Sequence, residues 1–196
     1  AEPLSSFDFN EFNDQHYEAS VREKNRAEDI SRVLYPNDST DEGKKLRLKQ
    51  QYFFCCASLQ DMIKNYKLVH GNDFSHFADF NAIQLNDTHP VISIPELIRQ
   101  LTRYEGVSFD DALNIAKKTF AYTNHTILPE ALEKWNKHLL IEVVPDIYEI
   151  IEKINNRFID ELYQQKRNPD FIQDVQIIKH DMIHMANLAM YGSSYV

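Results

Sequence analysis

Two short strand-like segments separated by helical patterns constrain the fold more than any other feature of the sequence. Residues 82–86 and 119–123 have the composition of strands, and two helical patterns lie between them, at 95–105 and 109–118. This order is typical of a crossover between parallel strands, in which the helices cover one face of the sheet. The sequence therefore predicts an α/β fold that is rich in helix and has a small parallel sheet.

Longer helical patterns account for most of the remaining chain. After an irregular arm at 1–13, a polar pattern favours a helix over 14–35, and an apolar stripe favours another over 42–68. The first helix has almost no apolar face in its middle, which indicates that it projects into solvent or meets a partner. The later elements predicted from the sequence are helices over 129–144, 145–165 and 181–190 and a strand over 175–180.

Capping signals mark several of these helix ends. Ser93 and Glu96 have the spacing of a capping box, which predicts the start of a helix. Gly106 follows that helix as the residue just after its C-terminus, and Ser108 is expected to cap the next helix. Pro36 ends the helix over 14–35, because the residue before a proline is pushed out of the α region.

Charge and glycine content exclude several classes of protein. Acidic residues outnumber basic ones by 30 to 21, for a net charge of −9, and no local basic stripe is present, so we expect no nucleic-acid partner. The four glycines lie far apart and form no glycine-rich phosphate loop. No apolar run approaches the ~20 residues of a membrane span. Because the adjacent Cys55 and Cys56 suit a reducing compartment, we expect a cytoplasmic protein without a membrane partner.

Polar residues follow both predicted parallel strands. Asn86, Asp87, Thr88 and His89 come after the first strand, and Thr123, Asn124, His125 and Thr126 come after the second. Ligands of open α/β sheets bind beyond the carboxyl ends of the strands, so we expect the two clusters to converge on one polar crevice. Alternatively, these residue types simply cap turns and helices. The recurrence at both strand ends favours a binding role, for a neutral polyhydroxyl or another small polar ligand.

A metal-dependent hydrolase is a further alternative. Asp87, His89 and His125 have the chemistry of metal ligands, although their spacing does not enforce a metal site. His180 and His184 are spaced to share one helix face, but the stretch lacks the glutamate of the zinc-protease motif. The sequence therefore predicts no resident metal.

Three stretches resemble one family: SRVLYPNDSTDEGKKLRLKQQYF, AIQLNDTHPVISIPELIRQL and KTFAYTNHTILPEALEKW. They are similar to the glycogen and maltodextrin (α-glucan) phosphorylases, most of all to bacterial members, and the similarity runs from about Phe7 to Tyr195. The resemblance implies that phosphate attacks the terminal α-1,4-glucosyl unit of a glucan and releases glucose 1-phosphate with retained configuration. It also implies a Rossmann-like sheet, here partial, from the N-terminal half of a two-domain GT-B glycosyltransferase.

The resemblance implies a set of sugar-binding residues. His125 matches the histidine that contacts the 6-hydroxyl region of the glucosyl unit. A gate loop at 36–43 carries Asn37 and Asp38, followed by Ser39 where the family usually has asparagine, so a water bridge is expected there. The residues that match the lining of the pocket beside the sugar are Asp87, His89 and Glu133.

The resemblance also implies an organisation for the whole chain. Residues 14–35 match the tower helix, through which the family forms a homodimer, and 44–196 match an α/β core segment of the N-terminal domain. The family's pyridoxal 5′-phosphate domain, with the cofactor lysine, the basic phosphate ligands and a glycine-rich loop, lies outside this sequence. We therefore expect the isolated chain to bind no cofactor and to be inactive. The alternative is a non-catalytic glucan-binding or dimerisation module.

Overall fold

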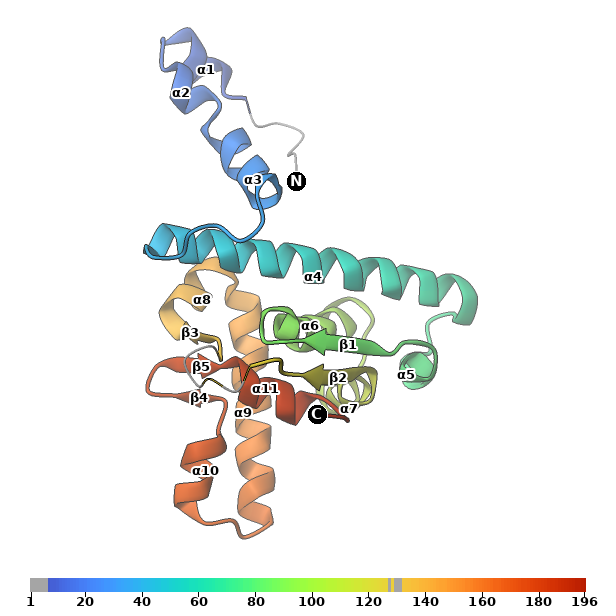
Figure 1. Cartoon of the computed structure of the whole chain (residues 1–196). Coiled ribbons are helices and arrows are strands. Elements are labelled where there is room, and N and C mark those ends of the chain that lie inside the picture. The colour runs from blue at the N-terminus through green and yellow to red at the C-terminus, as the bar shows by residue number, and fades with distance from the viewer. Residues whose placement is uncertain (1–6, 127, 129–131) are drawn as a thin grey trace. The chain divides into compact units, whose positions relative to one another are not determined.

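One long helix, α4 (Asp41–His70), takes the chain from the first of its two compact units to the second (Figure 1). The computed structural model describes residues 7–126, 128 and 132–196. The two units are Ala1–Phe53 and Phe54–Val196. Helix α4 confirms the helix predicted over 42–68, and Leu59 and Tyr66 of its apolar stripe are buried.

The first unit contains three helices where the sequence predicts an arm and a single helix over 14–35. They are α1 (Phe9–Asn13), α2 (Tyr17–Ser20) and α3 (Arg22–Arg32). The Asp8 carboxylate caps α1 by accepting hydrogen bonds from two backbone N–H groups, which fixes a helix start inside the predicted arm. Gln15, with a left-handed φ of 64°, separates α1 from α2, and Val21, at φ = −113° and ψ = 5°, separates α2 from α3 inside the predicted range. The prediction of one unbroken helix is therefore wrong.

The second unit contains the predicted parallel pair. Strands β1 (Ile83–Asn86) and β2 (Phe120–Thr123) lie side by side and point the same way, with Ile83 opposite Phe120 and Asn86 opposite Thr123 (Figure 1). A parallel bridge from Ala121 to Tyr195 extends the pairing on the other side of β2. The predicted crossover and its parallel sheet are confirmed.

Helices connect the two parallel strands and pack around them. Helix α6 (Ser93–Tyr104) packs against both α7 (Phe109–Thr119) and α9 (Pro145–Gln164). Gly106 has φ = 71° after α6, and the Ser108 hydroxyl caps α7, as the sequence predicts. The other helices of this unit near the parallel pair are η1 (Phe74–His76), α5 (Phe77–Phe80), η2 (His89–Ile92) and α11 (Met185–Gly192).

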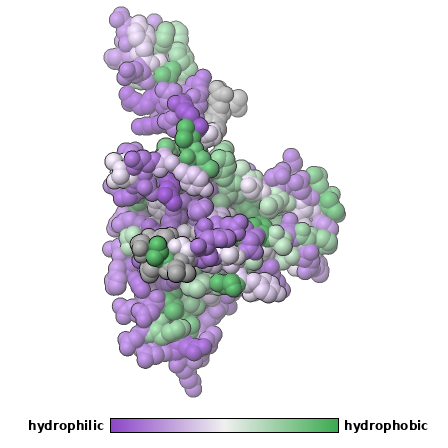
Figure 2. Space-filling model, in the orientation of Figure 1, coloured by the Kyte–Doolittle hydropathy of each residue, from purple (hydrophilic) through white to green (hydrophobic). Residues whose placement is uncertain are grey.

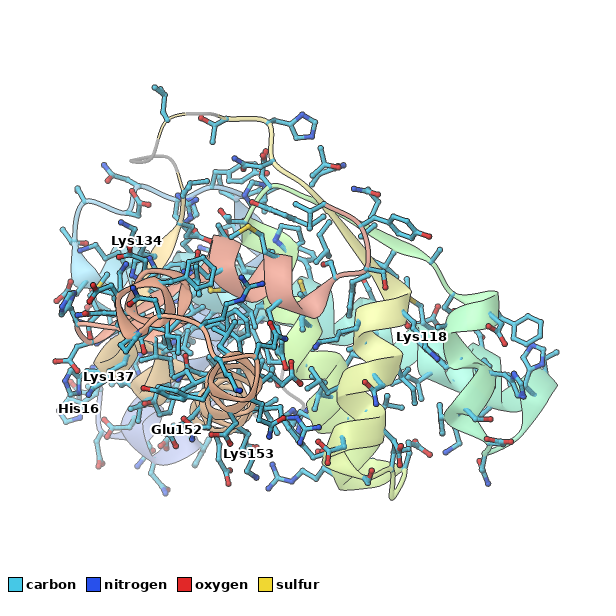
Figure 3. All side chains as sticks on the ribbon, turned by 90° about the horizontal axis from the view of Figure 1, so that it is seen from below. His16, Lys118, Lys134, Lys137, Glu152 and Lys153 are labelled. Atoms are coloured by element: carbon cyan, nitrogen blue, oxygen red, sulfur yellow. The ribbon has the colours of Figure 1, made fainter. Side chains whose placement is uncertain are left out.

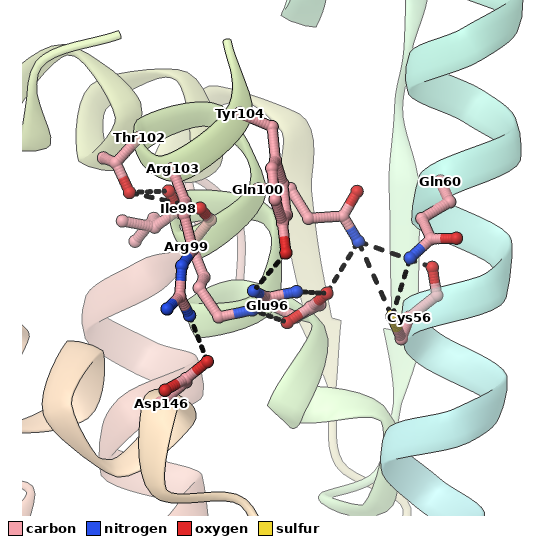
Figure 4. Close-up of polar contacts among 10 residues, drawn as sticks. All are labelled: Cys56, Gln60, Glu96, Ile98, Arg99, Gln100, Thr102, Arg103, Tyr104 and Asp146. Carbon is pink, nitrogen blue, oxygen red and sulfur yellow. Dashed lines mark hydrogen bonds and ion pairs between the residues drawn. The ribbon is translucent and has the colours of Figure 1, made fainter. Parts of the chain in front are cut away.

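The predicted capping box at the start of α6 is wrong. Ser93 makes no side-chain cap, because the 3₁₀ helix η2 runs directly into α6 and removes the need for one. Glu96 instead forms a buried ion pair with Arg99, with 2.7 Å between Oε2 and Nε. The Gln100 amide also donates a hydrogen bond of 2.6 Å to Oε1 of Glu96 (Figure 4). These bonds satisfy the charges inside the protein.

A small antiparallel sheet takes up parts of the helices predicted over 129–144 and 181–190. Its strands are β3 (Lys134–Asn136), β4 (Ile178–Lys179) and β5 (Met182–His184), in the order β3-β5-β4. The helix predicted over 129–144 forms only as α8 (Lys137–Val143); residues 129–131 lie outside the described part of the chain. Trp135 is buried in β3 opposite Ile183, so strand pairing overrides the helical spacing of its apolar neighbours.

The hairpin between β4 and β5 shortens the helix predicted over 181–190, of which only the part in α11 (Met185–Gly192) forms. His180 and Asp181 form its turn with φ = 51° and φ = 59°, the left-handed pair that a two-residue hairpin requires. His180 and His184 therefore do not share a helix face, and the strand predicted over 175–180 shrinks to Ile178–Lys179. The two other helices nearby are α9 (Pro145–Gln164), as predicted, and α10 (Pro169–Val175), which the sequence analysis missed.

The face of the molecule drawn in space-filling form is mainly polar (Figure 2). Hydrophilic residues cover most of the face shown in Figure 2, and hydrophobic residues form small separate groups. Among the described helices, none combines the length and the hydropathy that a membrane span requires. Both cysteines are free thiols, as predicted.

Candidate functional site: the turns after the parallel strands

The turns after β1 and β2 are joined by the side chain of Asp87. The backbone N–H of Asp87 donates to the carbonyl of Thr123 (2.8 Å), which continues the β1–β2 ladder by one residue. Asp87 then takes φ = 63°, and its Oδ1 accepts a hydrogen bond of 2.7 Å from the backbone N–H of His125. Aspartate tolerates this left-handed conformation better than most residues. The carboxylate of one turn therefore holds the backbone of the other.

Thr88 holds a third segment at the same place. Its buried hydroxyl lies 3.4 Å from the backbone N–H of Glu133, which donates to it. The carbonyl of Glu133 in turn accepts a hydrogen bond of 3.2 Å from the backbone N–H of Met185. Two successive side chains after β1 thus position His125 and Glu133, and the predicted convergence of the two polar clusters is confirmed for these backbones.

The imidazoles of the two clusters have different surroundings. The side chain of His125 is exposed, so its two ring nitrogens are accessible to a ligand. His89 is half-buried and begins the helix η2. Glu133 is half-buried between its two backbone contacts. Of these groups, the exposed imidazole of His125 is the best placed to meet a molecule from solvent.

The sequence analysis did not single out Tyr122. Its ring is buried on β2 opposite Leu85, and no partner for its hydroxyl lies among the described residues. Burial raises the pKa of this phenol, and the negative charge of Asp87 raises it further, so the hydroxyl stays protonated. In the stretch FAYT, buried and less buried residues alternate, which places Tyr122 on the buried face of the strand. This alternation is the sequence signal that could have indicated Tyr122.

The predicted gate loop belongs to the first unit and is held by local bonds. Asn37 Oδ1 accepts a hydrogen bond of 2.9 Å from the backbone N–H of Ser39. Arg47 Nη1 lies 2.8 Å from Asp38 Oδ2 in an ion pair. A Cβ atom at Gly43 would lie 2.0 Å from the Asn37 carbonyl oxygen, so only glycine allows the loop to lie this close to α4. Asn37 and Asp38 therefore have structural contacts of their own.

A metal site receives no support from the geometry. Within the described ranges, no group of three or more histidine, cysteine, aspartate or glutamate side chains is arranged to hold a metal ion. Within the possible set Asp87, His89 and His125, one carboxylate oxygen of Asp87 accepts a hydrogen bond from the backbone N–H of His125. The metal-dependent hydrolase therefore stays an alternative that rests on the sequence alone.

Lys117 does not fit the Schiff base that pyridoxal 5′-phosphate forms with a protein. Burial lowers the pKa of Lys117, as such a lysine requires. Its ammonium, however, lies 3.6 Å from the centre of the Tyr191 ring and 3.9 Å from a carboxylate oxygen of Glu161. These contacts occupy the amine, and no catalytic step through the cofactor can be derived from this chain.

The sequence matches one protein family along its full length. A family model described as carbohydrate phosphorylase matches residues 1–196. An α-glucan phosphorylase, H isozyme, of Solanum tuberosum is 45% identical over 98% of this chain and 24% of its own length. Glycogen phosphorylase 2 of Dictyostelium discoideum is 47% identical over 98% of this chain and 20% of its own length. The liver form of human glycogen phosphorylase is 42% identical over 98% and 24%, respectively. The chain thus spans about a fifth to a quarter of these relatives.

Proposed function

Because the chain belongs to the carbohydrate phosphorylase family, we propose that it is a segment of an α-1,4-glucan phosphorylase. The complete enzyme would use inorganic phosphate to release glucose 1-phosphate from glycogen or maltodextrin. The observation that carries this proposal is the 2.7 Å hydrogen bond from the His125 backbone to Asp87. It joins the LNDTHP and YTNHT stretches, which carry the family resemblance, into one site.

His125 would orient the terminal glucosyl unit. A neutral imidazole donates from one nitrogen and accepts at the other, which suits a sugar hydroxyl such as that on C6. Asp87 holds the backbone of this residue and so acts as a positioning residue. Because catalysis depends on the alignment of the sugar with the attacking phosphate, this support contributes to the rate without contact with the reacting atoms.

The other predicted residues have proposed roles of their own. His89 and Glu133 would line the pocket beside it, with Glu133 held by Thr88. Asn37, Asp38 and Ser39 would form a gate, in which the short Ser39 hydroxyl reaches the sugar through a water molecule.

The remaining chemistry would come from parts of the enzyme that this chain does not span. In the intact family, pyridoxal 5′-phosphate supplies a phosphate group that handles protons during phosphorolysis. We infer that the 196 residues alone bind no cofactor and release no glucose 1-phosphate. An alternative function, a non-catalytic glucan-binding or dimerisation module, rests on the same turns, since the whole Asp87–His125 contact lies within this chain.

The proposal extends to the setting of the enzyme. The β1–β2 sheet would be part of the Rossmann-like sheet of a GT-B fold, and 44–196 would be the core segment of its N-terminal domain. Residues 14–35, although broken into short helices, would meet their counterpart in a homodimer. We place the enzyme in the cytosol, as the name of one Arabidopsis relative states for that protein, and among bacterial-type members.

A chimaeric enzyme tests this function. The 196 residues would replace the matching segment of the Solanum α-glucan phosphorylase, to which they are 45% identical. We expect the chimaera to release glucose 1-phosphate from maltoheptaose, and His125→Ala to lower kcat/KM roughly 10- to 100-fold. Lys118→Ala, at an exposed position on α7, is the control and should leave the rate unchanged.

The isolated chain supplies the second arm of this test. Glucose 1-phosphate released by the 196 residues with added cofactor would contradict the proposed inactivity. Binding of maltoheptaose by the isolated chain, combined with a folded but inactive chimaera, would favour the alternative module. A chimaera that folds and retains full activity after His125→Ala would remove His125 from the site.

A further inference from the structure

Three basic side chains share one face of the small antiparallel sheet. Lys134 on β3 lies directly opposite His184 on β5, and Lys179 on β4 lies directly opposite Met182 on β5. Residues opposite each other in antiparallel strands point to the same face, and so do residues two apart along one strand. Lys134, Lys179 and His184 therefore share a face, which we call the cationic face.

The charges on the cationic face lack acidic partners. Within the described part of the chain, Lys134 forms no ion pair. The ammonium of Lys179 donates a hydrogen bond of 3.3 Å to the backbone carbonyl of Asp174 and forms no ion pair there either. Asp181, the acidic residue in the adjoining turn, is engaged by Lys137. Within the described residues, a protein of net charge −9 thus keeps two lysine ammonium groups without a carboxylate partner on one face of this sheet.

The positively charged residues around His184 affect the pKa of its imidazole. Burial lowers the pKa of the half-buried imidazole, and the positive charges of Lys134, Lys179 and His180 lower it further. A bound anion would reverse the electrostatic part of this effect, because it would favour the protonated imidazole.

We propose that the cationic face binds a phosphate-type oxyanion, either inorganic phosphate or the phosphate monoester of a sugar. Two ammonium groups and one imidazolium give several charge-assisted donors, which suit the three or four oxygens of such an anion. The site uses none of the residues assigned to the sugar and does not depend on the proposed phosphorolysis.

Titration of the 196-residue chain, followed by NMR of the His184 imidazole, tests this site. Inorganic phosphate should shift the His184 signals saturably and raise the pKa of the imidazole. Lys134→Gln should weaken phosphate binding roughly tenfold, the effect of losing one charge-assisted contact. Lys118→Gln is the matched control: it removes the same charge from α7, and Figure 3 shows Lys118 well separated from Lys134.

A comparison of glucose 6-phosphate with inorganic phosphate identifies the source of the anion. Glucose 6-phosphate binding more tightly than phosphate would assign the face to sugar phosphates, and phosphate binding alone would assign it to the free ion. The proposal is contradicted if sodium chloride at equal ionic strength, or glucose, produces the same shifts. It is also contradicted if Lys134→Gln and Lys118→Gln weaken binding equally while circular dichroism shows both variants folded.

Discussion

Two polar networks in the second unit use hydrogen bonds of the same length for different purposes. In α6, the Glu96 and Arg99 side chains are both buried, with 2.7 Å between Oε2 of Glu96 and Nε of Arg99. The Gln100 amide donates a further hydrogen bond to the Glu96 carboxylate (Figure 4). After the parallel strands, the 2.7 Å bond from His125 to Asp87 engages only the backbone of His125 and leaves its imidazole exposed. The first network satisfies its own charges and stabilises the fold. The second fixes a backbone and leaves a side chain for a ligand.

The largest effect is expected in the buried network. Glu96→Gln leaves the Arg99 guanidinium without its countercharge in a dry site, and should lower the free energy of unfolding by about 3–5 kcal/mol. Urea denaturation followed by circular dichroism measures this loss. Arg103 lies on the same helix as Glu96 and forms an exposed ion pair with Asp146 of α9, so Arg103→Gln is the control and should cost about 1 kcal/mol or less. Equal losses would mean that burial does not distinguish the two pairs.

A smaller loss is expected at the strand-end turn. Asp87→Ala removes the acceptor of the His125 N–H and places alanine at φ = 63°, so we expect a loss of about 1–3 kcal/mol. Asp87→Asn keeps an acceptor oxygen and tolerates this φ, and should recover most of that stability. The same urea experiment compares them. If Asp87→Asn is as unstable as Asp87→Ala, charge rather than the hydrogen bond holds the turn.

Removal of the exposed imidazole should leave stability nearly unchanged. His125→Ala keeps the backbone N–H that Asp87 holds, so the free energy of unfolding should change by less than about 0.5 kcal/mol. In the chimaera, the same substitution should still lower phosphorolysis. A stability loss as large as that of Asp87→Ala would show that the imidazole packs against the protein instead of serving a ligand.

The free energy of unfolding should also depend on pH through His184, which lies on β5 outside both networks. Because its pKa in the folded state is lowered, the unfolded chain takes up a proton first as the pH falls below about 6.5. Stability should therefore decrease with falling pH from there down to the folded pKa, and His184→Gln should remove this part of the slope. Unfolding in phosphate-free buffer at several pH values measures it. Identical slopes of stability against pH in the wild-type and His184→Gln proteins would contradict the assignment of this pH dependence to His184.

The parallel pair and its convergent turns were predictable because they depend on local composition. Residues 82–86 and 119–123 read as strands, and the polar residues that follow them met as the parallel geometry requires. The paired strands also place Tyr122 on a buried face, but its partnerless hydroxyl depends on which atoms surround it, which a sequence pattern does not contain.

The failed predictions share a different cause. The apolar spacing around Trp135 fits a helix, yet pairing with Ile183 makes that segment a strand. His180 and Asp181 form a hairpin turn in left-handed conformations, although this turn lacks the glycine or asparagine that usually indicates a hairpin in a sequence. The left-handed Gln15 and the turn at Val21 likewise divide the region 14–35, whose composition suits one helix. In each case a nonlocal contact or an atypical turn residue overrode the local pattern.

A double-mutant cycle in the chimaera tests the central claim most directly, namely that Asp87 acts on the sugar through His125. The quantity is kcat/KM for phosphorolysis of maltoheptaose in Asp87→Ala, which removes the acceptor of the His125 N–H, in His125→Ala and in the double variant. If Asp87 works only by holding His125, the double variant should lose no more activity than His125→Ala alone. Losses that multiply would show that the two residues act independently, and would contradict the account.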